Sequence, residues 1–383
     1  MAIVSVIASA TIAMVVVGPP ELSPGRQPIG PSQDPIRVVS SAHQVNFPEE
    51  VTFRLEAEAD TYITEVIVHY IFAGQKVRAY GYAEFTPAKR VSADFKLRTG
   101  GANYVPIGVT IEYYYEITDA TGNTLVTQTD SLEYRDSRYQ WQELRQGDLL
   151  VLWHDLPEEK VRVVASDVDR RLEAVKAVLD LKQVPVMTAV ILRSRPEADR
   201  SFPVVSGVAS RRHLYGGFAY GDFDLFVLAG LNVDGMVHEM THLLMDEAID
   251  SPLATIPAWL NEGMAMHFET RSGQRQATVE RAARNSDLLS LGSMNAVPGR
   301  PRDVRLFYAQ SWSVIEYMID TYGMNQIALL LDTLNSGNRI DAAIREVYGV
   351  SLQELEEKWV AKVSGETPLA PRPDPGTTGT SFL

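Results

Sequence analysis

The segment His238-Glu239-Met240-Thr241-His242 constrains this chain more than any other stretch, because its side chains act together only if they lie on a helix. Residues four apart share one face of an α-helix, so both imidazoles can point at one metal ion. Glu239 lies at the edge of that face, where a general base can reach a water beside the ion. The alternative is an exposed helix that carries these residues by chance. With 7 histidines in 383 residues, that coincidence is improbable.

The segment WLNEGMA, residues 259–265, supplies a third ligand in Glu262. Pro257 suits the first turn of a helix and places Glu262 on its second turn. Two histidines and one carboxylate leave one coordination position open, which distinguishes a catalytic zinc site from a structural one. This mixed nitrogen and oxygen donor set suits zinc better than magnesium or calcium. We therefore expect one zinc ion per chain.

Together, HEMTH and WLNEGMA resemble the gluzincin metallopeptidases, which include thermolysin and the membrane alanyl aminopeptidases. The closest resemblance is to the bacterial peptidase MA-like domains, over about residues 149–363. It implies a zinc-dependent peptide-bond hydrolase with His238, His242 and Glu262 as ligands and Glu239 as the base.

One departure from the family pattern concerns the second partner of a ligand histidine. Thermolysin-type enzymes carry an Asp one turn after the ligand Glu, and here that position is Met266. The partner must come from elsewhere, with Asp246 or a backbone carbonyl as the candidates.

A tyrosine follows the ligand segments in the run Tyr308-Ala309-Gln310-Ser311. Peptidase MA-like domains have a similar Tyr-x-x-Ser segment, and the related aminopeptidases use a tyrosine hydroxyl to stabilise the oxyanion. The resemblance therefore implies a catalytic role for Tyr308, since a phenol donates a hydrogen bond without charge. The alternative is that Tyr308 only packs.

An edge strand ahead of the zinc helix binds the substrate backbone in the gluzincins, as an added strand would. By resemblance, the substrate-binding residues here are Gly217, Phe218, Ala219 and Tyr220. The alternative is a core strand, because aromatic residues in strands are often buried.

Composition excludes several classes of function. The net charge of −14 argues against a nucleic-acid partner, because binding phosphates needs basic surface. The chain has no cysteine, which excludes disulfides, thiolate zinc sites and a cysteine nucleophile.

The N-terminal segment bears on localisation. Residues 2–17 are apolar apart from two serines and a threonine, and the first charge is Glu21. This resembles a signal h-region without its basic n-region, so the start is misassigned or truncated, or the segment is a weak membrane anchor. A buried first strand or helix is the alternative. We expect an extracytoplasmic protein, secreted or attached to a membrane, with a Pro-rich linker up to residue 35.

The domain pattern predicts an α+β chain. Residues 36–140 alternate apolar and polar side chains in about seven runs over roughly 100 residues, which is typical of an immunoglobulin-like β-sandwich. Residues 145–364 follow as the peptidase MA-like catalytic domain, and residues 365–383 as a disordered tail. Residues 149–363 are expected to fold and bind zinc alone. Within them we expect a buried strand at 184–192, helices at 303–322 and 351–363, and a partly mobile segment at 271–302.

The sequence thus predicts a zinc-dependent peptidase acting on a peptide or protein substrate. Two alternatives remain: a metallohydrolase acting on a non-peptide amide, and a surface binding protein with a structural metal site. Glu239 argues against the second, because a structural site needs no base. Nothing in the sequence separates an aminopeptidase from an endopeptidase.

Overall fold

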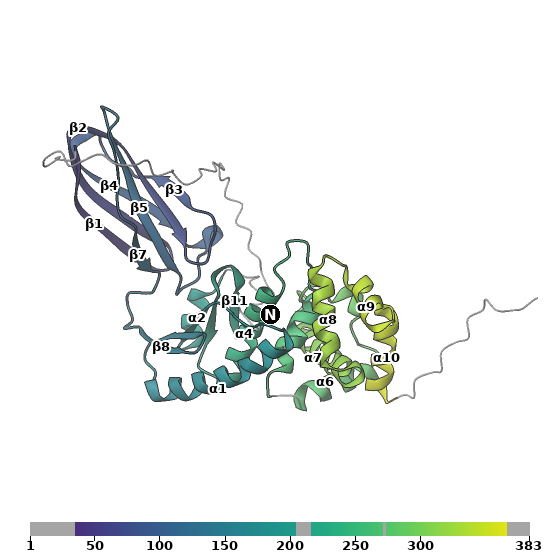
Figure 1. Ribbon diagram of the computed structural model, residues 1–383. Coiled ribbons are helices and arrows are strands. Elements are labelled where there is room, and N and C mark those ends of the chain that lie inside the picture. Colours follow the sequence, from purple (N-terminus) through teal and green to yellow (C-terminus); the bar gives the residue numbers. More distant parts are fainter. Residues whose placement is uncertain (1–34, 204–215, 271–272, 366–383) are drawn as a thin grey trace, which may run out of the picture. The chain divides into compact units, whose positions relative to one another are not determined.

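The computed structural model describes residues 35–203, 216–270 and 273–365 of the chain (Figure 1). The predicted signal or anchor segment, nearly all of the linker and the predicted tail lie outside the described residues. By its internal contacts the chain divides into two compact units. One comprises residues up to 169 together with 185–233, and the other residues 170–184 together with those from 234 onward.

The first unit begins with a β-rich region, whose strands pair antiparallel in one seven-stranded sheet. Its long strand β2 joins two halves, because residues 50–58 pair with β1 and β4 while residues 63–72 pair mainly with β3 and β5. The strands are β1 (Ile36–Asn46), β2 (Glu50–Phe72), β3 (Ala79–Tyr82), β4 (Ala88–Arg98), β5 (Thr110–Asp119), β6 (Thr124–Val126) and β7 (Asp130–Glu133), with a short 3₁₀ helix η1 (Gly101–Asn103).

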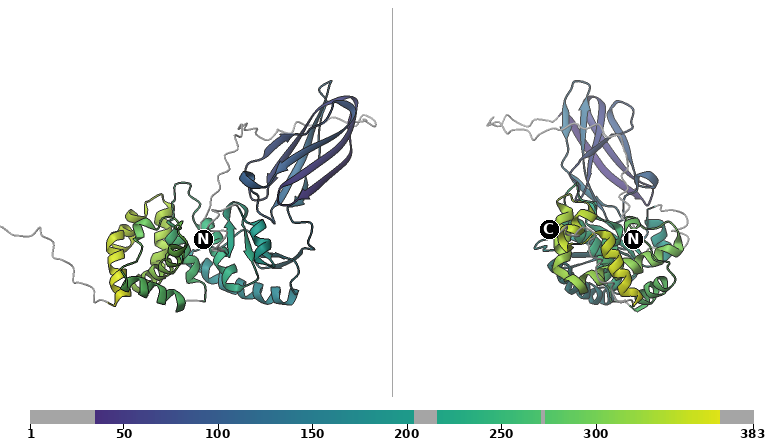
Figure 2. Two further views of the ribbon diagram at one scale, coloured as in Figure 1. Left: turned by 180° about the vertical axis from the view of Figure 1, so that it is seen from behind. Right: turned by 90° about the vertical axis from the view of Figure 1, so that its right-hand side faces the viewer.

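This sheet curls so that its two halves face each other across a core. Phe53, from the first half of β2, packs edge-to-face against Tyr113 of β5, with ring centroids 4.7 Å apart. Figure 2 shows the long strands of the region from two further sides. The predicted N-terminal antiparallel β region is confirmed. It differs from a sandwich of two separate sheets in that β2 runs without a break through residues 59–64 and belongs to both halves.

A second sheet completes the first unit, with the strand order β11-β12-β10-β9-β8. Its strands are β8 (Gln142–Gln146), β9 (Leu149–Trp153), β10 (Met187–Leu192), β11 (Gly217–Tyr220) and β12 (Leu225–Ala229). The central strands β9, β10 and β12 are parallel, and β8 and β11 form antiparallel edges. Strand β10 confirms the predicted buried strand, because parallel strands covered on both faces need continuous apolar runs.

Helix α2 (Arg195–Ser201) belongs to the first unit, and α1 (Glu158–Val178) runs from the first unit into the second. The other regular elements of the second unit are helices. These are α4 (Val233–Ala248), α5 (Ala258–His267), α6 (Gly273–Arg284), α7 (Pro301–Tyr322), α8 (Met324–Asn335), α9 (Ile340–Tyr348) and α10 (Leu352–Ser364), with a 3₁₀ turn η3 (Leu291–Ser293). Among the described residues, no helix is long and apolar enough to cross a membrane.

Local sequence signals explain how several of these helices begin and end. Helix α10 starts with a capping box of Ser351 and Glu354, and α7 ends at Gly323, which is its C-cap residue. The segment 271–302, expected to be partly mobile, instead contains α6 and η3 within its described part. The expectation was wrong there. Most residues of α6 are polar and its buried residues are Val279 and Ala282, so the sequence lacks a continuous apolar face that would predict a helix.

One hydrophobic cluster runs through both sheets of the first unit. It joins Val105, Ile107 and Val109, which follow η1, to residues of β9, β10 and β12. Gly108 lies at this contact with φ of +98°, and a Cβ there would come within 2.5 Å of Val190 Cγ2. The two sheets therefore share a core. This shared core argues against the predicted independent folding of residues 149–363, which stays a prediction.

We predict that a chain starting at Leu149 will be insoluble or much less stable than one spanning residues 36–365. The cut removes β8, the partner of β9, and exposes the apolar side of the second sheet that the shared core covers. Solubility and thermal unfolding of the two purified chains measure this. A soluble 149–363 chain with an unchanged melting temperature would restore the prediction of two independent domains.

Candidate metal centre

Helices α4 and α5 bring the three predicted ligands together in the second unit. The Nε2 atoms of His238 and His242 lie 3.2 Å apart, and Glu262 Oε2 lies 3.5 Å from each of them. His242 and Glu262 are almost completely buried. Among the described residues, these three side chains form the candidate metal-binding group.

The hydrogen bonds on the far side of each imidazole determine which nitrogen faces the cluster. His238 Nδ1 lies 2.7 Å from Glu269 Oε1, and His242 Nδ1 lies 2.9 Å from Asn261 Oδ1. Both partners are acceptors, so each Nδ1 carries the proton and donates it. In the neutral imidazoles, both Nε2 lone pairs then face the same point beside a carboxylate oxygen. Such an arrangement requires positive charge at that point.

The electrostatics of His238 agree with this requirement. Burial alone lowers its pKa, but hydrogen bonds to Glu262 and Glu269 outweigh burial and raise the pKa to about 10. Without a metal ion, a proton on His238 therefore supplies the positive charge that balances the carboxylates of Glu262 and Glu269. A bound metal ion would displace this proton, because a ligand nitrogen must be deprotonated.

The distances test whether zinc fits. Zinc bonds of about 2.0 to 2.2 Å in a tetrahedron place neighbouring ligand atoms roughly 3.3 to 3.6 Å apart. The three separations observed are 3.2, 3.5 and 3.5 Å. The donor set and its spacing thus fit a tetrahedral ion with one position left for water or substrate.

Glu239 lies next to His238 on α4 and is almost completely buried. Its Oε2 atom is buried without a hydrogen-bond partner. Burial raises the pKa of this carboxyl to about 8, with the nearby charge of Glu262 acting in the same direction. A buried carboxylate oxygen without a partner costs stability, so its retention points to a chemical role.

The outer partners of the histidines differ from the sequence prediction. Neither Asp246 nor a backbone carbonyl holds the imidazoles; Glu269 and Asn261 do. Glu269 lies just beyond the end of α5 and is paired with Arg275, which also donates to the Met266 carbonyl at 3.1 Å.

A sequence signal existed for only one of these partners. Asn261 is a short amide directly before the ligand Glu262, so it shares the helix that faces α4. Glu269 follows the helix, and only tertiary packing brings it back to His238. Met266, one turn after Glu262, is buried and holds neither imidazole.

Tyr308 lies on α7, which packs closely against α5. A Cβ on Gly263, the residue after the ligand Glu262, would lie 2.6 Å from the Ser311 carbonyl oxygen. The Tyr308 hydroxyl is buried without a hydrogen-bond partner. The predicted catalytic role of Tyr308 stays a prediction.

The predicted substrate-binding residues form a strand at the edge of the second sheet. Residues Gly217, Phe218, Ala219 and Tyr220 are β11, which pairs on one side with β12. Tyr220 also makes a hydroxyl contact of 2.8 Å with Tyr104. Their role in binding substrate stays a prediction.

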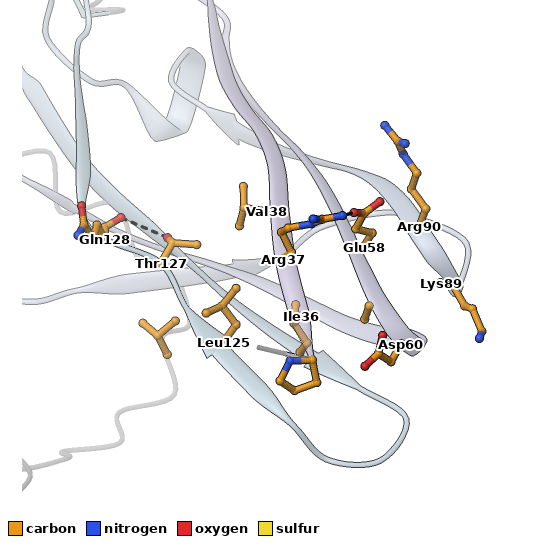
Figure 3. A pocket seen from close by; sticks show the side chains of 13 residues that line it. Ile36, Arg37, Val38, Glu58, Asp60, Lys89, Arg90, Leu125, Thr127 and Gln128 are labelled. Carbon is orange, nitrogen blue, oxygen red and sulfur yellow. Dashed lines mark hydrogen bonds and ion pairs between the residues drawn. The ribbon is translucent and has the colours of Figure 1, made fainter. Parts of the chain in front are cut away.

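A cavity of about 730 Å³ lies on the β-rich region, away from these ligands in sequence. It is lined by β1, β6 and neighbouring residues, and in Figure 3 Arg37 points at Glu58 while Lys89 and Arg90 extend outward. None of the residues that line it is a histidine or a predicted ligand, so this cavity is not the metal site.

A buried pair of histidines with one carboxylate and an adjacent glutamate is the arrangement of metal-dependent hydrolases. Residues 207–365 match the family model of the Peptidase MA superfamily. The matched region includes both ligand segments, and the match confirms the resemblance drawn from them.

No curated protein matches the chain. Among solved structures, an aminopeptidase N family protein from Idiomarina loihiensis is 8% identical, with a TM-score of 0.39 over 81% of this chain and 73% of that one. A carbohydrate-binding module family 56 β-1,3-glucan binding domain is 19% identical, with a TM-score of 0.17 over 24% of this chain and 96% of that one. Each TM-score lies below 0.5, so the assignment rests on the family model.

We predict that Glu269→Ala weakens zinc binding by about 10- to 100-fold, as loss of an outer partner of a ligand histidine typically does. The substitution frees His238 to rotate and removes the carboxylate that favours its ligand tautomer. Competition with a chromophoric chelator measures the dissociation constant. The control is Glu247→Ala, which removes an exposed carboxylate from α4, the helix that carries His238. This variant should bind zinc normally. Equal affinities for both variants would remove Glu269 from the site.

Proposed function

We propose that the chain is a zinc-dependent peptidase that hydrolyses peptide bonds with Glu239 as general base. The observation that carries the proposal is the convergence of His238, His242 and Glu262 beside the buried carboxylate of Glu239. Membership of residues 207–365 in the Peptidase MA superfamily supports a peptide substrate.

The residues of the site divide the chemistry between them. When bound, zinc would supply a Lewis acid that activates water and polarises the substrate carbonyl. His238, His242 and Glu262 would hold the ion. Glu239 accepts the proton of the attacking water and returns it to the leaving amine, and its unpartnered Oε2 is available for that proton. Tyr308 donates a hydrogen bond to the developing oxyanion.

The substrate backbone binds along β11 in this proposal. The Ala229 N–H donates to the Gly216 carbonyl, so Gly216 and alternate residues after it face β12. The backbone groups of Gly217 and Ala219 then face the side of β11 that pairs with no other described strand, where an extended peptide can add as a further strand. A peptide in extended form is therefore the expected substrate.

Two alternatives use the same residues. A purely structural metal site gives no account of the buried Glu239. A metallohydrolase acting on a non-peptide amide would use it equally. Screening the apo and zinc-loaded chain against a peptide library separates these functions, since only the peptidase cleaves peptides in a zinc-dependent way.

We further propose an extracytoplasmic location, supported by the apolar residues 2–17 and the Pro-rich stretch that follows them. Fractionation of cells that express the full chain tests this location, and recovery in the cytosol alone would contradict it.

We predict different outcomes for two Glu→Gln substitutions in the site. Glu239→Gln should retain about one zinc per chain and lose turnover by about 10² to 10⁴, because only the proton acceptor is removed. Glu262→Gln should lose zinc as well, because the substitution removes a charged ligand. Elemental analysis and peptide hydrolysis measure both quantities. Near-normal turnover by Glu239→Gln would show that another group is the base, and absence of zinc from the native chain would overturn the proposal.

Tyr308→Phe should lower kcat by about 10² to 10³ with normal zinc content, as loss of one oxyanion donor does. The substitution removes one hydroxyl that has no hydrogen-bond partner to lose, so the fold should tolerate it. Tyr317→Phe, further along the same helix, is the control and should retain activity. If kcat is unchanged in Tyr308→Phe, this tyrosine only packs.

A further inference from the structure

The helix that carries the ligand Glu262 lacks a side-chain cap at its start. Pro257 is the N-cap residue of α5 and makes no capping hydrogen bond. The first N–H groups of a helix have no partner within it and need acceptors from elsewhere. Here the N–H of Ala258 donates to the Asn295 carbonyl and the N–H of Trp259 to the Met294 carbonyl, each at 3.2 Å.

Those two carbonyls belong to residues 289–295, which we call the brace. The brace contains η3 and is pinned into the helical unit by the buried side chains of Leu291 and Met294. Its carbonyls do for α5 what a capping side chain does elsewhere, so the position of the brace determines where α5 begins.

Gln310 of α7 holds the brace in place. Its side chain is completely buried. Oε1 accepts the Leu289 N–H at 3.0 Å, and Nε2 donates to the Leu289 carbonyl at 2.5 Å and to Met294 Sδ at 3.2 Å. A primary amide is the side-chain group that can satisfy both the N–H and the C=O of one residue at once.

A second anchor lies on α10. Glu356 Oε2 accepts the Leu291 N–H at 3.0 Å and the Ser290 hydroxyl at 3.1 Å. This contact involves a partly exposed side chain, so water competes for it more than for the buried amide of Gln310.

Helix α7 therefore fixes the position of α5 at two points, one on each side of the ligand Glu262 in the sequence. One is the start of α5, reached through Gln310 and the brace. The other is Gly263, where a Cβ would approach Ile315 Cγ1 to 2.4 Å and leaves no room for the helices to separate or slide. Glu262 directly precedes Gly263 and follows the braced turn.

We propose that Gln310 is a positioning residue for the metal ligand Glu262, acting through the brace on the start of α5. The inference rests on the proposed zinc site. Gln310 does not touch the ligands, and its role is to keep the Glu262 carboxylate at the distance that matches the two imidazoles. Its side chain is needed because shifting a ligand by a fraction of an ångström weakens a metal site that its fold otherwise preorganises.

The test uses the full chain without metal, titrated with Zn²⁺ against a chromophoric chelator and with Co²⁺, whose visible absorption reports the geometry of its ligands. Gln310→Leu keeps the side-chain volume and removes all three polar contacts. We expect its zinc dissociation constant to rise by about 10- to 100-fold and its Co²⁺ spectrum to change. Ile344→Ala, a buried truncation on α9, is the control for general loss of stability and should keep the native affinity and spectrum.

Glu356→Ala covers the case in which Gln310→Leu does not fold. It releases the second anchor, and its zinc dissociation constant should rise by about tenfold, at the low end of the effect of outer partners. Native values for the folded Gln310→Leu, or for Glu356→Ala where only that variant folds, would overturn the inference. So would an equal loss of affinity in Ile344→Ala. A native chain that binds neither metal would instead overturn the proposed function, and this inference with it.

Discussion

Two imidazole nitrogens and one carboxylate oxygen lie within 3.5 Å of one another in the interior of the helical unit, and nothing apolar can hold them there. Their mutual repulsion must be balanced by a cation or by a proton. The surrounding structure supplies that balance only in part, through Glu269 and Asn261 on the outer nitrogens. The packing of α4, α5 and α7 therefore has to keep the two imidazole nitrogens and the carboxylate oxygen from moving apart.

That task explains why polar groups are buried here at all. Gln310, Asn261, Glu239 and Glu262 are all almost completely buried, although polar side chains are usually exposed. Gln310 and Asn261 form hydrogen bonds with specific partners, and Glu262 lies beside the two imidazoles. Each of these contacts restricts the position of a helix. Glu239 bears a buried oxygen without a hydrogen-bond partner, which costs stability and which the proposed role as general base would explain.

The sequence was informative where a function depends on residues close together along the chain. His238 and His242 share a helical face by their spacing alone, and Glu262 follows from a short motif on the next helix. The partner of His238 could not be predicted, because Glu269 lies beyond the end of α5 and only tertiary packing brings it to His238. The brace was missed for the same reason, since its polar, glycine-containing sequence indicates a mobile loop while its order comes from Gln310, 21 residues away.

The β-rich region gives a second case. The polar run around Asp60 and Thr64 reads as a break between two strands, and the structure continues one strand through it. Alternation of apolar and polar residues correctly predicted which side chains face the core, because that property is local. Whether neighbouring strands belong to one sheet or two depends on partners far along the chain, which no local pattern reports.

The continuity of β2 has a consequence for how the β-rich region assembles. Strands β1, β3, β4 and β5 all pair with β2 itself, so both halves of the curled sheet depend on this one strand for their pairing. The pairing of β2 with β5 joins residues some 40 to 60 positions apart, and contacts at such separations slow folding because the intervening chain must first be ordered. During synthesis, residues 50–59 can pair with β1 as soon as they emerge, whereas residues 65–72 lack their β5 partner until residues 111–118 have followed, so the two halves of one strand become paired at different times.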